Sequence, residues 1–213
     1  MKPYAAVIFD MDGVIVDSEP LHVRAFEEVF DQLGHGSDHG IHFPDFFGRS
    51  DRVVWESFIA RHQPSQSLAE LTHVKEQRYL ELLHATQPIY PGVESLIRTL
   101  AANTPLGLAS GSVHTMIEAV LALRDLRPLF RAVSSSQDVA HPKPAPDVFL
   151  HAASGLGIAP EECVVIEDSA AGVAAARAAG MRVIAITNSL PADRLQAAHA
   201  IVSHYDELGK LLL

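Results

Sequence analysis

Residues 5–20 read AAVIFDMDGVIVDSEP, an apolar run that ends in two aspartates and a glycine. A short continuous apolar run is typical of a strand that is buried on both faces, as in a parallel sheet. Asp10 and Asp12 follow this strand directly, and residues i and i+2 project to the same side of an extended chain. Gly13 then permits a sharp turn that brings the backbone close to a ligand. The stretch therefore predicts a buried strand that delivers two carboxylates to one place.

Further apolar runs alternate with helical patterns along the rest of the chain. Strands are predicted over residues 105–110, 132–135, 163–167 and 182–187, and helices over residues 93–102, 114–123, 147–156 and 170–179. Such alternation predicts an α/β fold with a doubly wound parallel sheet. In sheets of this kind the ligand crevice lies beyond the carboxyl ends of the strands.

One segment, residues 17–87, interrupts this alternation. It contains amphipathic helical patterns over residues 21–32, 52–61 and 68–83 and no convincing strand. About 70 residues are too many for a loop, so we expect an inserted helical domain. The predicted domains are an α/β core formed by residues 1–16 and 88–213, and a helical cap formed by residues 17–87. The cap begins directly after the two aspartates, where a lid over the crevice would begin.

Other polar residues are predicted at the same rim of the sheet as the two aspartates. They are Ser110 after the second strand, Lys143 before the third helix of the core, and Glu167 and Asp168 at the end of the fourth strand. Carboxylates suit a hard divalent cation such as Mg²⁺, whereas a lysine and a hydroxyl suit an anion. Phosphoryl transfer requires this combination of charge neutralisation and positioning. A carboxylate can attack phosphorus, and a second carboxyl can donate a proton to the leaving oxygen.

Four ordered motifs carry a family resemblance that covers nearly the whole chain. They read FDMDGVIVDSE (9–19), LASGS (108–112), HPKPAPDVF (141–149) and VVIEDSAAGVAAARAAGM (164–181). The chain resembles the haloacid dehalogenase superfamily, and more closely its sugar-phosphatase and β-phosphoglucomutase branch. That branch has a helical cap inserted after the first motif and a Rossmann-like core.

The resemblance implies a role for each residue of the rim. Asp10 would be the nucleophile and Asp12 the general acid and base. The implied Mg²⁺ ligands are Asp10, the backbone carbonyl of Asp12, Asp168, and Glu167 through a bound water. Ser110, Gly111 and Lys143 would bind the phosphoryl group. The implied activity is a Mg²⁺-dependent phosphatase that acts on a small phosphorylated metabolite, expected to be a sugar phosphate, through an aspartyl-phosphate. The alternative is a phosphomutase that uses the same intermediate.

Four residues of the predicted cap are candidates for contact with the rest of the substrate. His22 and Lys75 stand where the mutase branch has a histidine and a lysine near its substrate, and Arg49 and Arg52 could bind an anionic group. However, Asp51 stands where the mutase pattern has an arginine. This departure favours the phosphatase over the mutase.

Two other interpretations concern different classes of site. A phosphorylated receiver module also joins an acidic pocket, a hydroxyl and a lysine on a doubly wound sheet, but its motifs come in another order. His35, His39 and His42 crowd the stretch HGSDHGIH (35–42). A zinc site there would need a fourth ligand, so we favour a polar loop.

Composition limits the partners. The 213 residues carry a formal net charge of −10, which disfavours binding to nucleic acid through its phosphates. No apolar stretch approaches the roughly 20 residues of a membrane span, and no signal pattern is recognised at the N-terminus. The single cysteine, Cys163, favours a reducing compartment, so we expect a cytoplasmic protein. No seam or large apolar patch indicates an oligomer, and we expect a monomer.

Overall fold

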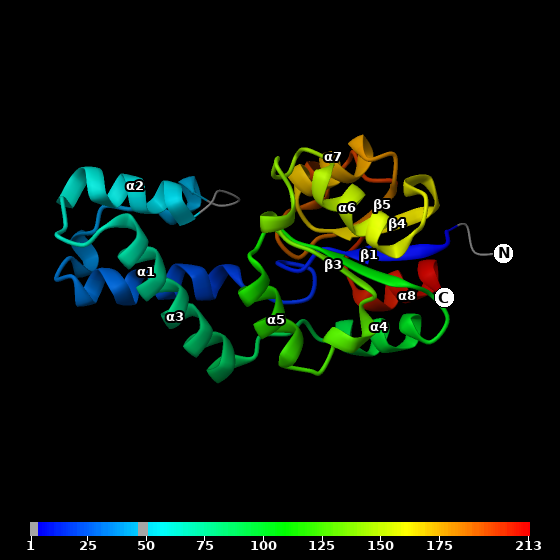
Figure 1. Cartoon of the computed structure of the whole chain (residues 1–213), viewed down its shortest axis with the longest axis horizontal. Helices are drawn as coiled ribbons and strands as arrows, with labels where there is room; N and C mark the ends of the chain where they lie inside the picture. Colours follow the sequence, from blue (N-terminus) through cyan, green and yellow to red (C-terminus); the bar gives the residue numbers. More distant parts are fainter. Residues whose placement is uncertain (1–3, 47–50) are drawn as a thin grey trace. The chain divides into compact units, whose positions relative to one another are not determined.

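The computed structural model describes residues 4–46 and 51–213. The chain divides into two compact units (Figure 1). The core unit comprises Met1–Asp17 and Pro88–Leu213, and the insert unit comprises Ser18–Gln87. Among the described residues no helix has the length and apolar character needed to cross a membrane.

The core unit contains a parallel sheet of six strands in the order β3-β2-β1-β4-β5-β6. The strands are β1 (Ala6–Phe9), β2 (Leu106–Ala109), β3 (Ala132–Ser134), β4 (Cys163–Glu167), β5 (Arg182–Ile186) and β6 (Ala200–Val202). From β1 the chain proceeds outward to β2 and β3 and then returns to β4 on the other side of β1. The strand order therefore reverses between β1 and β4, and a ligand crevice is expected at the carboxyl end of such a switch point. The predicted doubly wound α/β class is confirmed.

Helices cover both faces of this sheet (Figure 1). One face is covered by α6 (Asp147–Leu156) and α7 (Ala170–Ala178), and the other by α4 (Val93–Ala101), α5 (His114–Ala122) and α8 (Tyr205–Leu212). The side of α6 and α7 shares an apolar cluster with β1, β4 and β5, in which Ile8, Phe149 and Val165 are fully buried. Burial on both faces explains why the strands read as continuous apolar runs.

The last strand and helix, β6 and α8, were missing from the predicted elements. β6 has only three residues, and two of them are half-exposed, so its local pattern is weak. α8 is held in place by Tyr205, whose hydroxyl donates to the backbone carbonyl of Val14 at 2.5 Å. This contact joins residues 191 positions apart, which local periodicity cannot reveal.

The insert unit is built from α1 (Glu19–Gln32), α2 (Asp51–His62) and α3 (Leu68–Thr86). Helix α3 begins with a capping box in which the Ser67 side chain accepts from the Glu70 N–H and Glu70 reaches back to the Ser67 N–H. The unit has an aromatic core of its own, in which the ring of Phe30 stacks on Phe58 with centroids 4.4 Å apart. Trp55 is fully buried beside them.

Candidate active site

The site begins at the turn that follows β1. Gly13 has a φ of +74°, a conformation that favours glycine. A Cβ at this position would lie 1.8 Å from Oδ2 of Asp168, so only glycine allows the backbone to pass this close to the carboxylate. The Gly13 N–H donates to the Val16 carbonyl at 2.9 Å and closes the turn. Gly13 thus lets the segment that carries Asp10 and Asp12 pack directly against Asp168.

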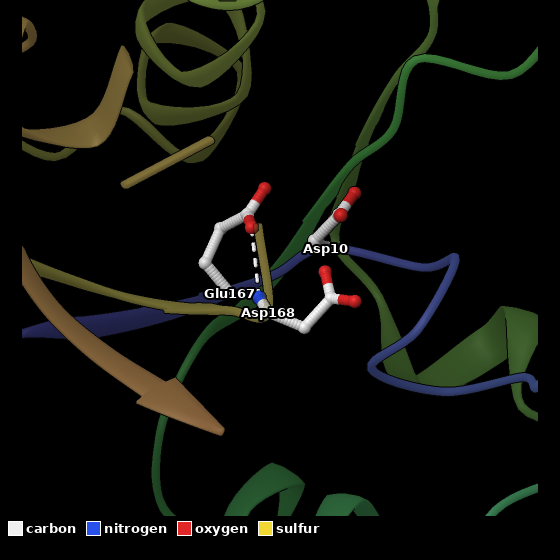
Figure 2. A group of neighbouring side chains, drawn as sticks. All are labelled: Asp10, Glu167 and Asp168. Carbon is white, nitrogen blue, oxygen red and sulfur yellow. Dashed lines mark hydrogen bonds between the residues drawn. The ribbon is translucent and has the colours of Figure 1, made fainter. Parts of the chain in front are cut away.

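Three buried carboxylates meet at the carboxyl ends of β1 and β4. These strands pair in register at Phe9 and Ile166, which brings Asp10 next to Glu167 and Asp168. The three side chains offer oxygens that all lie within 4.8 Å of one another (Figure 2). Glu167 is turned back toward its own chain, where its Oε2 accepts the Asp168 N–H at 2.8 Å.

Lys143 supplies the positive charge of the cluster. Its Nζ lies 2.9 Å from Oδ1 of Asp10 and 2.7 Å from Oε1 of Glu167. Burial alone lowers the pKa of Lys143, but attraction to Asp10 and Glu167 outweighs burial and holds this pKa above its usual value. The ammonium therefore stays charged beside the two carboxylates.

The carboxylates respond differently to this environment. Burial raises the pKa of Asp10 well above its usual value, and Lys143 offsets this only in part. Burial, and then repulsion by Glu167, raises the pKa of Asp168 to about 7. Burial also acts on Glu167, but its pKa is lowered because Lys143 and Ser169 donate to the charged form. Three carboxylates thus share one ammonium.

The excess negative charge provides a test of whether the site suits a cation. A second positive charge would offset the burial and the repulsion between carboxylates that raise the pKa of Asp10 and Asp168. Buried carboxylate oxygens are the hard donors that Mg²⁺ prefers. These residues therefore fit a divalent cation. Within residues 4–46 and 51–213, the group of acidic side chains that could hold a metal ion consists of Asp10, Glu167 and Asp168.

The end of β2 adds hydroxyl groups to the site. Ser110 is fully buried, and its N–H donates to the Ser134 carbonyl at 3.0 Å. Its Oγ donates to Oδ2 of Asp12 at 3.3 Å. At Gly111 a Cβ would meet nothing within 4 Å, so the backbone there is openly accessible.

The predicted cap residues separate into different environments. Lys75 is fully buried in the insert unit, where its Nζ donates to Oδ2 of Asp51 at 2.5 Å and contacts Nδ1 of His22. His22 also stacks on Tyr79, with ring centroids 4.3 Å apart. Arg52 instead forms an exposed ion pair with Glu56. Arg49 lies outside the described residues.

The three histidines of residues 35–42 do not share ligand geometry with one another. His35 packs against His62 with ring centroids 4.0 Å apart, and His39 stacks on Phe30 with ring centroids 4.8 Å apart. His42 pairs with Asp45 at the surface. Each histidine therefore has a separate local role in this segment.

Comparison with known proteins identifies the family. A family model described as haloacid dehalogenase-like hydrolase matches residues 4–180. The chain belongs to this family. This hydrolase is 39% identical over 184 residues to hexitol phosphatase B of Escherichia coli K12, with 85% of this chain and 82% of the relative covered. It is 36% identical over 191 residues to protein CbbY of Rhodobacter capsulatus, with 84% and 83% covered.

Solved structures and a mutase relative extend this result. β-Phosphoglucomutase of Bacillus subtilis is 32% identical over 195 residues, with 87% of this chain and 84% of the relative covered. A crystal structure of CbbY from Rhodobacter sphaeroides in complex with xylulose-(1,5)-bisphosphate superimposes with a TM-score of 0.81 at 25% identity. That comparison covers 98% of this hydrolase and 99% of the CbbY chain. Both phosphatases and a mutase are therefore among its relatives, and the predicted family and enzyme class are confirmed.

Three polar residues of the hydrolase site were not predicted. Ser112 Oγ donates to Oδ2 of Asp12 at 2.8 Å. Asn188 Nδ2 donates to the Gly13 carbonyl at 2.7 Å, and Ser189 hydrogen-bonds to the Asp168 side chain. Asn188 and Ser189 follow the end of β5, where ligand-binding residues are expected in a parallel sheet, so the sequence contains a signal for both.

Proposed function

We propose that this hydrolase is a Mg²⁺-dependent phosphatase that hydrolyses a sugar phosphate or a similar small phosphate ester through a phosphorylated Asp10. The observation that carries the proposal is the contact between Asp10 and Lys143, 2.9 Å apart in a buried site, with Asp12 two residues further along. An ammonium at this distance can stabilise both the carboxylate and the phosphoryl oxygens that approach it. The phosphatase relatives support the hydrolytic outcome.

The first half of the proposed reaction transfers the phosphoryl group to the protein. A carboxylate oxygen of Asp10 forms a bond to phosphorus, and the bond between phosphorus and the ester oxygen breaks. Asp12 donates its proton to the leaving oxygen, which departs as an alcohol. Ser110, the Gly111 backbone and Lys143 hold the phosphoryl oxygens.

The second half regenerates the enzyme. Asp12, now ionised, accepts a proton from water, and the water oxygen bonds to phosphorus as the bond to Asp10 breaks. Orthophosphate is released. Asp10, Asp168 and the Asp12 backbone carbonyl would hold Mg²⁺, with Glu167 acting through water. When bound, the cation would neutralise charge on the phosphoryl oxygens.

We further propose that residues 17–87 act as a cap domain that selects the substrate. His22 and Arg52 keep exposed surface for such contacts, whereas Lys75 has none and would act through His22 and Asp51. We expect a cytoplasmic monomer whose partner is a small metabolite. A net charge of −10 supports neither a nucleic-acid partner nor an anionic membrane surface.

Orthophosphate release from a panel of sugar phosphates tests the function, with Asp10→Asn beside the unmodified protein. We expect release that depends on Mg²⁺ and is lost in Asp10→Asn. The phosphomutase candidate, supported by the β-phosphoglucomutase relative, predicts isomerisation stimulated by a sugar bisphosphate without net release. That result, or full activity in Asp10→Asn, would overturn the phosphatase proposal.

A further inference from the structure

Ser112 holds the Asp12 side chain from the neighbouring strand end. Its Oγ donates to Oδ2 of Asp12 at 2.8 Å, within the usual range for a hydroxyl donor. The corresponding distance from Ser110 Oγ is 3.3 Å, which is longer than that range. Ser112 therefore makes the stronger of the two serine contacts with Asp12.

The backbone of Ser112 is itself fixed by two hydrogen bonds. Its N–H donates to Oγ of Ser110 at 3.0 Å. Its carbonyl accepts the Ser136 N–H at 3.1 Å, from the segment that follows β3. These two bonds connect Ser112 to the ends of β2 and β3. The Ser112 hydroxyl is thus presented to Asp12 from a rigid position.

Ser110 and Ser112 would have different roles in the proposed reaction. A phosphoryl group that accepts a hydrogen bond from the Ser110 hydroxyl would compete with the 3.3 Å contact between Ser110 and Asp12. The Ser112 contact would remain and keep the Asp12 carboxyl from rotating to another rotamer. A displacement of about 1 Å in a catalytic group can cost about 100-fold in rate.

We propose that Ser112 is a positioning residue that orients Asp12 for proton transfer to the leaving oxygen and from water. The inference rests on the proposed function, because it assigns Asp12 as the acid and base. It differs from a phosphate-binding role, since the contact of Ser112 is with Asp12. The two roles predict different dependence on the leaving group.

Esters with different leaving groups separate these roles. Fructose 1-phosphate releases an alkoxide that needs a proton, whereas p-nitrophenyl phosphate releases a phenolate that is stable without one. kcat/KM reports the reaction up to departure of the leaving group. In Ser112→Ala we expect kcat/KM for fructose 1-phosphate to fall about 10- to 100-fold. For p-nitrophenyl phosphate kcat/KM should stay within about threefold, while kcat falls because water activation also needs Asp12.

Two further variants control for folding and for the hydroxyl. Ser112→Thr keeps the hydroxyl and should restore kcat/KM for fructose 1-phosphate to within a fewfold. Ser136→Ala keeps the backbone N–H that holds Ser112 and should leave both substrates unaffected. Circular dichroism and the melting temperature establish that each variant is folded. If Ser112→Ala does not fold, Ser112→Cys takes its place in the comparison.

Equal losses on both esters would indicate phosphate binding or a general structural effect and would overturn the proposal. No loss on either ester would also overturn it. Failure of the phosphatase proposal itself would be recognised separately, by retention of turnover in Asp10→Asn.

Discussion

The buried ion pair of Lys75 and Asp51 should make removal of the acid more damaging than removal of the base. Lys75 is fully buried, and its Nζ lies 4.7 Å from the Phe26 ring centroid and 5.4 Å from that of Tyr79. The Asp51 side chain keeps 33% of its surface exposed. Asp51→Ala removes the carboxylate that balances this buried ammonium and leaves it beside the two rings and the His22 imidazole. Lys75→Met instead leaves a carboxylate that water can reach and keeps an apolar chain in place.

The magnitude follows from the burial of each partner. Breaking a fully buried pair by removing one partner costs about 3–5 kcal/mol. Because Asp51 is partly exposed, we expect Asp51→Ala to lower the free energy of unfolding by about 2–3 kcal/mol. Lys75→Met should cost about 1 kcal/mol, since Met is similar in length to the buried stem.

The pH dependence has a definite sign. Burial lowers the pKa of Lys75, and Asp51 partly offsets this. In Asp51→Ala the effect of Asp51 is lost, and only the smaller attractions of Glu76 and Glu19 still oppose burial, so the pKa of Lys75 should fall further. A base whose pKa is lower in the folded state destabilises folding fully below the folded pKa, and this effect disappears as pH rises toward the unfolded value of about 10.4. Asp51→Ala should therefore regain stability as the pH rises toward about 10, and Lys75→Met should not.

The single tryptophan provides the assay. Trp55 is fully buried in the insert unit, so its fluorescence during urea denaturation reports unfolding of that unit. Glu56→Ala is the control, because it removes an exposed ion pair on the same helix and should change stability by less than about 0.5 kcal/mol. If Lys75→Met proved more destabilising than Asp51→Ala, or if Asp51→Ala were no less stable at neutral pH, the account of a buried charge held by Asp51 would be refuted.

Three other changes have clear expected outcomes. Gly172→Ala would place a Cβ 1.6 Å from Oε1 of Glu167, so Glu167 must move away from Lys143. We expect at least about a 10-fold loss in kcat/KM, and unchanged kinetics would contradict this packing. Phe58→Ala removes a fully buried ring and should lower the stability of the insert unit by about 3–5 kcal/mol in the Trp55 assay; a loss below about 1 kcal/mol would show that the ring contributes little to this core. A chelator should abolish orthophosphate release and added Mg²⁺ should restore it, whereas turnover that persists in the chelator would exclude the proposed metal requirement.

The sequence alone determined the fold class of the core unit and the convergence of its polar residues. Each long strand is a local apolar run, and a local run can be recognised without knowing its neighbours. Parallel strands place their carboxyl ends at one edge, so the meeting of Asp10 with Asp168 follows from the strand pattern itself. β6 could not be predicted, because three residues, two of them half-exposed, carry too little periodicity.

Which charged residues pair with one another depends on the tertiary structure. Lys143 lies between Asp10 and Glu167, while Lys75 is buried against Asp51, a residue 24 positions away. Sequence identifies a lysine and an aspartate but not the pairing between them, because that pairing depends on how separate elements pack. The contact of Ser112 with Asp12 spans 100 positions and depends on the same packing. Local patterns therefore determine the elements, whereas only the folded chain determines the electrostatic partners on which the chemistry depends.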